Sequence, residues 1–274
     1  MRIQQRTTTA CRVACASMLA LIAFASTLRA DETPTTPGDT TKPDRKSLIT
    51  GRLGLGAIAL PRYSGGNGYQ VWPVPLADLE LGDVAYIDYW QAGLYVAATQ
   101  DKTLGLAIIA APRIGFNSSD GDRLAGMMDR KSSLEMGMSI DYAVGPGGIS
   151  LGYLHDVTGA SNGGVVRLIG GRRFEITEHL GLDGYLEADW LSAKVANYYF
   201  GVGANEATAT RPFFQPGSDT NFQLGLHFNY DFGRRSTILF GYEATVLGGA
   251  IAESPIVMTR LSNLLYIGYG WHFR

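Results

Sequence analysis

Residues 221–232 read NFQLGLHFNYDF, and apolar and polar or small residues alternate through the whole stretch. This period of two indicates a β-strand, because successive side chains of a strand point to opposite faces. The strand is about twice the usual length of roughly 5–6 residues. Two environments suit it: a soluble sheet packed on a core, or a membrane wall with lipid outside and water inside.

The same alternation recurs along the chain, for example in SLEMGMSIDY (133–142), GLDGYLEADW (181–190) and TILFGYEATV (237–246). Helical periodicity is absent over any useful length, and after the N-terminal segment no run approaches 18 apolar residues. Strands of about ten residues are long enough to cross a bilayer at a tilt. The pattern predicts twelve strands: 48–60, 69–81, 83–90, 92–99, 103–116, 132–144, 148–157, 164–176, 180–193, 219–232, 235–247 and 261–273.

The connections between these strands fall into two alternating sets. Short turns lie near 82, 100, 146, 178 and 234, whereas longer loops occupy 61–68, 117–131, 158–163, 194–218 and 248–260, with one short exception near 91. Outer-membrane barrels have short periplasmic turns and longer external loops, and a soluble sandwich has no reason to sort its loops by length. The sequence therefore predicts an all-β fold, a single antiparallel transmembrane β-barrel of about 12 strands, with ten as the alternative count.

The N-terminal segment differs from the rest of the chain. Residues 1–30 combine a basic start, an apolar run and small residues, which is the layout of a secretory signal peptide. Cleavage is expected after Ala25 or after Ala30, and the apolar run is shorter than the ~20 residues that a membrane span needs. Residues 31–46 are rich in Pro, Thr and charge and predict a disordered periplasmic leader, so the barrel would occupy 47–274.

The mature chain excludes several classes of function. Both cysteines, Cys11 and Cys15, lie in the signal segment, so disulfide and thiolate-metal chemistry are excluded. The segment also carries four of the 23 basic residues, so 19 remain against 25 acidic residues, a net charge of −6. Such a chain is not expected to bind nucleic acid. We expect an outer-membrane protein of a Gram-negative bacterium, surrounded by lipid.

The C-terminal strand carries a second indication of a membrane barrel. It ends YIGYGWHFR, in which Gly268, Trp271 and Phe273 resemble the signal by which the barrel assembly machinery recognises its substrates. Arg274 departs from the usual terminal aromatic residue.

Several segments, in order and spacing, resemble the MipA/OmpV family of outer-membrane proteins, which is named for an MltA-interacting protein. They are GLGAIALPRYSGGNGYQVWPVPLADLELGD (54–83), LEMGMSIDYAVGPGGISLGYLHDVTGASNGG (134–164), NYYFGV (197–202) and AESPIV (252–257). Gly66-Asn67-Gly68 departs from the family, where an acidic residue is common. The resemblance implies a barrel and, for the name-giving branch, a scaffold that joins a lytic transglycosylase to a murein polymerase.

The polar face of the predicted strands carries charges of both signs. Paired carboxylates could perform acid–base chemistry or hold a divalent cation, or the charges could fill a narrow lumen through salt bridges. The predicted lumen residues are Glu135, Asp141, Asp183, Glu187, Asp189, Asp231, Glu243, Arg113, Arg167 and Arg173.

The four histidines do not form a catalytic pattern. His155 and Asp156 are adjacent and so point to opposite faces, and His227 has amides and glycine beside it along the strand. His179 lies in a turn and His272 at the periplasmic rim. Trp72, Trp90, Trp190 and Trp271 are predicted to lie in aromatic girdles. We expect no catalytic residue, no cofactor and no metal.

Three functions are considered from the sequence, and we favour the first. It is a non-enzymatic structural adaptor, whose partners would be the lytic transglycosylase and murein polymerase implied by the family. The second is a small channel for solutes or cations, and the third is a lipid-modifying barrel enzyme.

Overall fold

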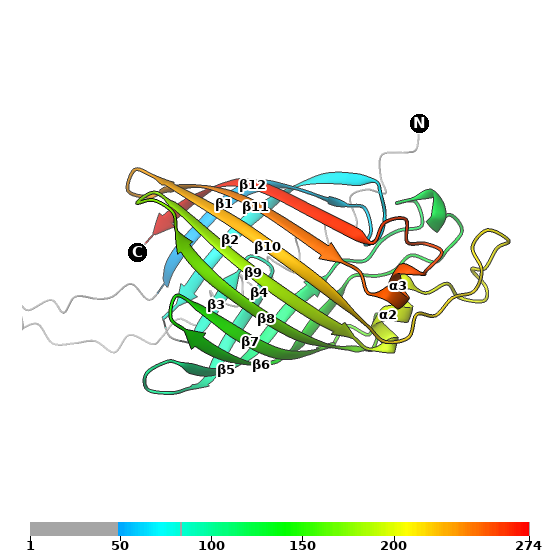
Figure 1. Cartoon of the computed structure of the whole chain (residues 1–274), viewed down its shortest axis with the longest axis horizontal. Coiled ribbons are helices and arrows are strands. Elements are labelled where there is room, and N and C mark those ends of the chain that lie inside the picture. Colours follow the sequence, from blue (N-terminus) through cyan, green and yellow to red (C-terminus); the bar gives the residue numbers. More distant parts are fainter. Residues whose placement is uncertain (1–48, 83, 274) are drawn as a thin grey trace, which may run out of the picture.

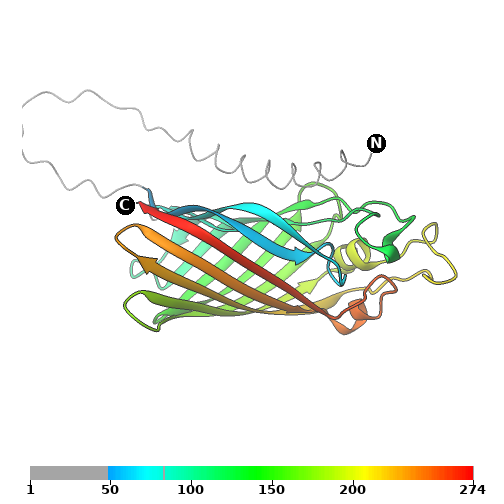
Figure 2. The same cartoon turned by 90° about the horizontal axis from the view of Figure 1, so that it is seen from above.

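The protein forms a closed barrel of twelve antiparallel strands in a computed structural model that describes residues 49–82 and 84–273 (Figures 1 and 2). The predicted all-β barrel is confirmed with twelve strands. The predicted signal peptide and leader lie outside the described residues. The strands are β1 (Ile49–Pro61), β2 (Tyr69–Leu81), β3 (Ala85–Asp88), β4 (Gln91–Ala98), β5 (Leu104–Arg113), β6 (Ser133–Val144), β7 (Gly147–Asp156), β8 (Gly164–Glu175), β9 (Leu180–Leu191), β10 (Asp219–Phe232), β11 (Ser236–Val246) and β12 (Leu261–Phe273).

The two ends of the barrel differ. Short turns, β1's first residue and β12's last residue lie at one end, here called the turn end (left in Figure 1). Gly82 and Gly233 lie in these turns with φ of 58° and 68°, a conformation that glycine adopts without steric cost. The opposite, loop end carries the longer connections, with a 3₁₀ helix η1 (Asp122–Leu124) and two helices, α2 (Ala193–Phe200) and α3 (Gly249–Ala252). None of the helices in the described ranges is long and apolar enough to cross a membrane.

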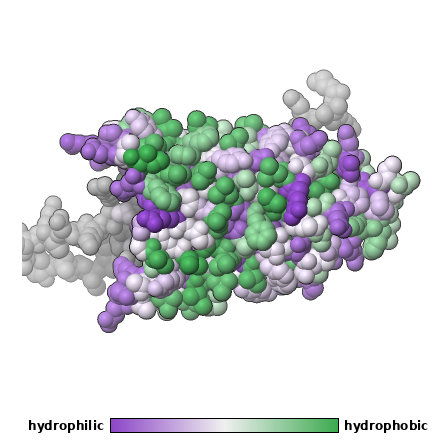
Figure 3. Space-filling model, viewed as in Figure 1, coloured by the Kyte–Doolittle hydropathy of each residue, from purple (hydrophilic) through white to green (hydrophobic). Residues whose placement is uncertain are grey.

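The outer face of the barrel wall is apolar. In β10, Phe222 and Tyr230 are 57% and 47% exposed, whereas inward-facing Asn229 is 4% exposed. The same contrast holds in β6, β7, β11 and β12. Hydrophobic residues gather on the wall between the hydrophilic turns and the more polar loop end (Figure 3). The alternation in residues 221–232 therefore separates a lipid-facing surface from a lumen, as predicted.

The third strand is shorter than predicted. The sequence suggested 83–90, but β3 covers only Ala85–Asp88. The chain turns at Tyr89, whose N–H donates to the Ala77 oxygen at 2.8 Å, and Trp90 then packs inside the barrel. The prediction that Trp72 and Trp90 lie in girdles is wrong, because both pack on a buried apolar cluster in the lumen: Ile58, Leu60, Val74, Leu76, Leu239 and Tyr266.

Candidate functional site in the lumen

Two arginines and three carboxylates form a network in the half of the lumen nearer the loop end. Arg113 binds Glu135 through two contacts of 2.5 and 3.1 Å. Arg167 binds Asp189, its direct cross-strand partner, through two contacts of 2.8 Å, and lies 3.4 Å from Glu187. Glu135 and Asp189 are 2% and 8% exposed. Buried charges of this kind are stable only when paired. The two bidentate pairs join neighbouring strands, β5 with β6 and β8 with β9, and a contact of 4.0 Å between Arg113 and Asp189 links them. We call these five residues the outer charge network.

Helix α2 lies over this network. The Tyr199 hydroxyl lies 3.0 Å from the Ser133 hydroxyl on β6, and the Arg113 guanidinium lies 5.9 Å from the centre of the Tyr199 ring. Val195 and Tyr199 belong to a buried cluster that also contains residues of β8, β9 and α3. A cationic guanidinium over an aromatic face is attracted to the ring electrons. Helix α2 is thus fastened to the wall and to the charges beneath it.

The longer loops form a cap with its own buried ion pair. Arg130, in the β5–β6 loop, contacts both carboxylate oxygens of Glu206, in the β9–β10 loop, at 2.9 and 2.7 Å. Arg211 donates to the backbone oxygens of Arg123, Ala125 and Glu206. All three side chains are buried. We call the loops 114–132, 192–218 and 247–260 the cap.

The pKa of Glu206 shows that its surroundings stabilise the charged carboxylate. Burial raises the pKa, but the hydrogen bonds from Arg130 and from the backbone N–H groups of Gly203 and Met128 lower it by more, to about 2. A carboxylate that accepts several hydrogen bonds favours its charged form. The cap is therefore held by a charge that persists over nearly the whole acidic range.

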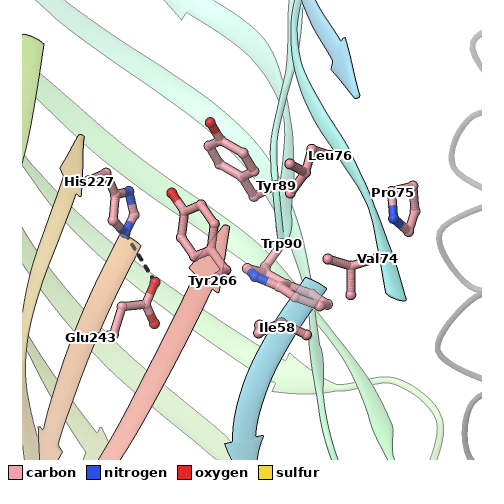
Figure 4. Close-up of a pocket in the computed structure, with 9 residues that line it drawn as sticks. All are labelled: Ile58, Val74, Pro75, Leu76, Tyr89, Trp90, His227, Glu243 and Tyr266. Atoms are coloured by element: carbon pink, nitrogen blue, oxygen red, sulfur yellow. Dashed lines mark hydrogen bonds and ion pairs between the residues drawn. The ribbon is translucent and has the colours of Figure 1, made fainter. Parts of the chain in front are cut away.

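A histidine and tyrosine rings occupy the middle of the lumen. The Nε2 atom of His227 lies 3.2 Å from Glu243, and the rings of Tyr185, Tyr266 and Tyr89 surround it at centroid distances of 5.3, 5.4 and 6.3 Å. Gln223 bridges the Tyr185 hydroxyl (2.7 Å) and Glu243 (3.2 Å). Figure 4 shows His227 and Glu243 beside Tyr266, with Tyr89 above. We call these six residues the central cluster.

Glycines make room for the rings of the central cluster. Gly225 faces Tyr185 across β9 and β10, and a Cβ atom there would lie 2.0 Å from that ring. Gly241 bears the same relation to Tyr266. Any larger residue at either glycine would displace a tyrosine from the middle of the lumen. The two glycines therefore allow the rings to lie flat across the strands.

The half of the lumen nearer the turn end is more open to solvent. Arg52 binds Asp78 and also donates to Asn229 at 2.7 Å, and Asn229 in turn donates to Asp183 at 2.7 Å. The side chains of Arg173 and Asp183 are 48% and 36% exposed, against 3% for Glu135. The charged side chains near the turn end are therefore more accessible to water than Glu135 in the outer charge network. A cavity of about 260 Å³ lies beside that network, lined by Arg113, Glu135 and Arg167 among others.

The ten sequence-predicted lumen residues divide among these groups. Six are in the outer charge network or the central cluster. Asp183 and Arg173 are 3.8 Å apart, Asp141 accepts from Ser139 and Ser150, and Asp231 lies 3.4 Å from His272. Of the predicted assembly residues, Trp271 is exposed on the outer face, Phe273 pairs with Gly51, and Gly268 leaves space for Leu76. Their role in assembly stays a prediction.

The sequence missed several residues of the site. His227 was expected to have only amides and glycine beside it, but its partners Tyr185, Glu243 and Tyr266 come from three other strands. Arg130 and Glu206 are 76 positions apart in the chain. For His227 the missing information was the register of the neighbouring strands, which alternation alone does not supply.

The chemical capacity of the lumen is limited by what surrounds His227. Its contacts are a carboxylate and three tyrosine rings, and no hydrogen bond among the described residues joins His227 to a serine or threonine hydroxyl. His272, near the turn end, does have such a partner, the hydroxyl of Thr237, which donates to Asp231. His155 lies on the exposed face beside Tyr153, whereas Asp156 is buried and caps the 158–162 loop. In residues 49–82 and 84–273, no group of three or more His, Cys, Asp or Glu side chains is placed to hold a metal ion.

Comparison with known proteins identifies one family. The profile described as "MltA-interacting protein MipA" matches residues 53–273. Outer membrane protein OmpV of Vibrio cholerae serotype O1 is 31% identical over 163 residues, and outer membrane protein Omp26La of Vibrio anguillarum is 28% identical over 162 residues. Each match covers 58% of this chain and 62% of the relative, which is less than two thirds of its length.

Solved outer-membrane proteins give weaker matches. An outer membrane channel from Pseudomonas putida F1 is 11% identical, with a TM-score of 0.40 over 85% of this chain and 100% of that chain. OmpT of Vibrio cholerae is also 11% identical, with a TM-score of 0.38 over 82% and 97% of the two chains.

Proposed function

The chain belongs to the family of the MltA-interacting protein MipA and lies in the outer membrane of a Gram-negative bacterium, and from this premise we propose that it is a non-enzymatic scaffold. Its proposed partners are a lytic transglycosylase of the MltA class and a murein-synthesising enzyme. The turn end then faces the periplasm, where the murein lies, and the cap faces outwards.

The observation that carries the proposal is the middle of the lumen, where His227 and the rings of Tyr185, Tyr266 and Tyr89 gather. The central cluster and the outer charge network occupy the barrel interior, and the cap lies beyond them. A general channel needs a continuous aqueous path, whereas a scaffold needs a rigid body with a fixed periplasmic face. Interlocked ion pairs and ring contacts favour the rigid body.

The contacts of His227 support a non-enzymatic role. Glycerolipid or acyl chemistry at a histidine needs a nucleophile within hydrogen-bond reach of the imidazole. The groups that contact His227 are Glu243 and three tyrosine rings. In the described residues the imidazole is therefore a structural partner of Glu243.

The periplasmic turns supply the proposed docking surface. Arg172, near one turn, and Arg234 and Arg235, in another, are exposed. Arginine is favoured in protein interfaces because its planar group makes bidentate contacts with carboxylates. We expect a periplasmic partner to present acidic residues to these turns, with the leader 31–46 as a second contact.

Copurification with a lytic transglycosylase of the MltA class tests the proposal. The barrel in lipid nanodiscs should retain the enzyme, and Arg234→Glu with Arg235→Glu should reduce retention at least severalfold. Deleting residues 31–46 should also reduce it. The matched control is Lys131→Glu with Lys194→Glu, the same change of charge on exposed residues of the cap, which should leave retention unchanged. Equal binding by all four proteins, or none by the wild type, would contradict the scaffold.

A further inference from the structure

The three loops of the cap meet around a cavity of about 480 Å³. It is lined by residues 122–125 of the β5–β6 loop, residues 208–211 of the β9–β10 loop and Pro255 of the β11–β12 loop. The β9–β10 loop reaches furthest from the strands (yellow in Figure 1). The cavity therefore belongs to the outer end of the molecule, and it shares no lining residue with the outer charge network or the central cluster.

Arg211 is the one buried residue that lines the cavity, with 7% of its surface exposed. Its Nε and Nη2 atoms donate to the backbone oxygen of Glu206 at 3.2 and 2.8 Å. Its Nη1 atom donates to the backbone oxygens of Arg123 and Ala125 at 2.7 and 3.0 Å. A guanidinium has five N–H groups, so these contacts fix its position and leave one N–H of Nη2 without an acceptor among the described residues.

The charge of Arg211 has no carboxylate partner. All of its acceptors are neutral backbone carbonyls, and no Asp or Glu side chain of residues 49–82 and 84–273 lies within ion-pair distance of it. Glu206 contacts it only through its backbone, because the Glu206 carboxylate is paired with Arg130. An arginine is almost never buried unless an anion accompanies it. This arrangement indicates an anion that does not come from the described chain.

Arg123 supplies a second guanidinium to the same cavity. Its side chain is exposed, and its one side-chain hydrogen bond runs from Nη1 to the Pro255 oxygen at 2.7 Å. This contact holds the side chain between two loops and leaves the Nε and Nη2 donors available. Arg123, like Arg211, has no ion pair within the described part of the chain. One fixed and one exposed guanidinium therefore line one cavity.

The remaining polar groups of the cavity are two threonines and one aspartate. The Thr208 and Thr210 hydroxyls lie 3.5 Å apart, so when one donates to the other a hydroxyl hydrogen is still left over. Asp122 is exposed and forms no ion pair with either arginine in the described ranges. Its charge opposes an anion, but two guanidinium groups outweigh one carboxylate.

We propose that this cavity binds a phosphate group, either as inorganic phosphate or as the monoester of a small soluble molecule. The tetrahedral phosphate presents oxygens in several directions, which suits donors that come from different loops. A carboxylate presents only two oxygens in one plane, so it satisfies one guanidinium and not both. The proposal does not depend on the scaffold role or on any periplasmic partner.

Hydrogen exchange of the cap tests the site with the barrel in dodecyl maltoside micelles, which contain no phosphate. Inorganic phosphate at millimolar concentration should slow the exchange of backbone amides in residues 121–126 and 203–214 at least severalfold, because it joins the two loops. Sodium chloride and sodium acetate at the same ionic strength should not. Glycerol 3-phosphate should act at the same or a lower concentration than inorganic phosphate.

Charge substitutions on exposed residues identify the site. Arg123→Gln should raise the phosphate concentration that gives half of the effect roughly tenfold, because one charge-assisted contact is lost. Asp122→Asn should lower it severalfold, because a repelling charge is removed. The matched control is Lys194→Gln, which removes an exposed cation of α2 outside the cavity and should change nothing. Arg211→Gln is unsuitable, because it also removes the hydrogen bonds that hold the loops together.

Nanodiscs distinguish a soluble ligand from a lipid head group. Phosphatidic acid carries a phosphate monoester, yet without added phosphate it should slow exchange no more than phosphatidylcholine does, because the cavity lies in the outermost loops. Slowing by phosphatidic acid alone would overturn the soluble source and assign the phosphate to a lipid. Equal slowing by chloride, or a phosphate response that is the same in Arg123→Gln, Asp122→Asn and the wild type, would overturn the site.

Discussion

Leu226 and Gln223 lie three positions apart on β10 and face different surroundings. Leu226 is on the outer face near the middle of the strand, opposite Tyr242, whereas Gln223 points inwards to Tyr185 and Glu243. Leu226→Arg should lower the free energy of unfolding by about 2–4 kcal/mol, because it places a charge at the bilayer midplane. Denaturant unfolding in lipid vesicles measures this.

Gln223→Arg is the matched control for that substitution. An arginine there can pair with Glu243 inside the lumen, so its cost should be clearly smaller than that of Leu226→Arg. Equal losses at the two positions would show that the faces of β10 are assigned wrongly.

Glu206 gives the cap a pH dependence. Its pKa is about 2 in the folded protein and has an ordinary value of 4.5. A lowered pKa contributes stability that is complete above the unfolded value and is lost as the pH falls through the folded value. The loop 192–218 should therefore become more accessible to hydrogen exchange between about pH 4.5 and pH 2. In Glu206→Gln the loop should exchange faster at neutral pH and lose most of this acid dependence; an unchanged profile would contradict the role of the pair.

Residue facing could be predicted from alternation, but the partners of each inward residue could not. The strict period of two in residues 221–232 was enough to assign Phe222 and Asn229 to opposite faces. Alternation does not show which residues of neighbouring strands lie opposite each other. The contacts of His227 with residues of β9, β11 and β12 therefore could not be predicted. The cap pair Arg130–Glu206 joins two irregular loops, for which periodicity carries no information.

At the scale of elements, two prolines lie on an unpaired edge of β2. Among the described residues, positions 69–77 of β2 pair only with β1. The Tyr89 N–H donates to the Ala77 oxygen, so the odd-numbered backbone groups of β2, which include Pro73 and Pro75, point to the unpaired side.

Pro75→Ala places an N–H on the unpaired edge inside the bilayer, so we expect a loss of about 1–3 kcal/mol, the cost of an unsatisfied buried donor. Pro212→Ala, in an exposed part of the cap, controls for the greater freedom of the unfolded chain. Denaturant unfolding in lipid vesicles measures both losses, and the loss should be larger for Pro75→Ala than for Pro212→Ala. Equal small effects would mean that an N–H at position 75 is not left unpaired.

The same region shows where element prediction failed. Residues 83–90 contain apolar and aromatic residues on both faces, so alternation could not place the end of the strand. The chain turns at Tyr89 because Trp90 fills space against Ile58 and Val74 in the lumen. Apolar side chains face the lumen here as well as the lipid. The apolar character of Trp72 and Trp90 therefore could not show which side of the wall they face.

At the scale of the whole molecule, the barrel closes where β12 meets β1. Phe273 pairs with Gly51 at the end of this seam, and the terminal residues also resemble an assembly signal. Phe273→Ser should therefore sharply reduce the amount of folded barrel in the outer membrane, as judged by heat-dependent electrophoretic mobility of membrane fractions. Deleting Arg274 alone should have a mild effect. A strong effect of the Arg274 deletion with a mild effect of Phe273→Ser would reverse the assigned roles.

The closed interior is the central claim, and single-channel recording in planar bilayers tests it most directly. The wild-type protein should give no steady conductance steps, because the Tyr185, Tyr266 and Tyr89 rings with His227 occupy the middle of the lumen. Tyr185→Ala with Tyr266→Ala should produce steps, which shows that the assay can detect an opened barrel. Steady steps from the wild type, with a cation selectivity that changes in Glu187→Gln and Asp189→Asn, would contradict the account and establish a channel.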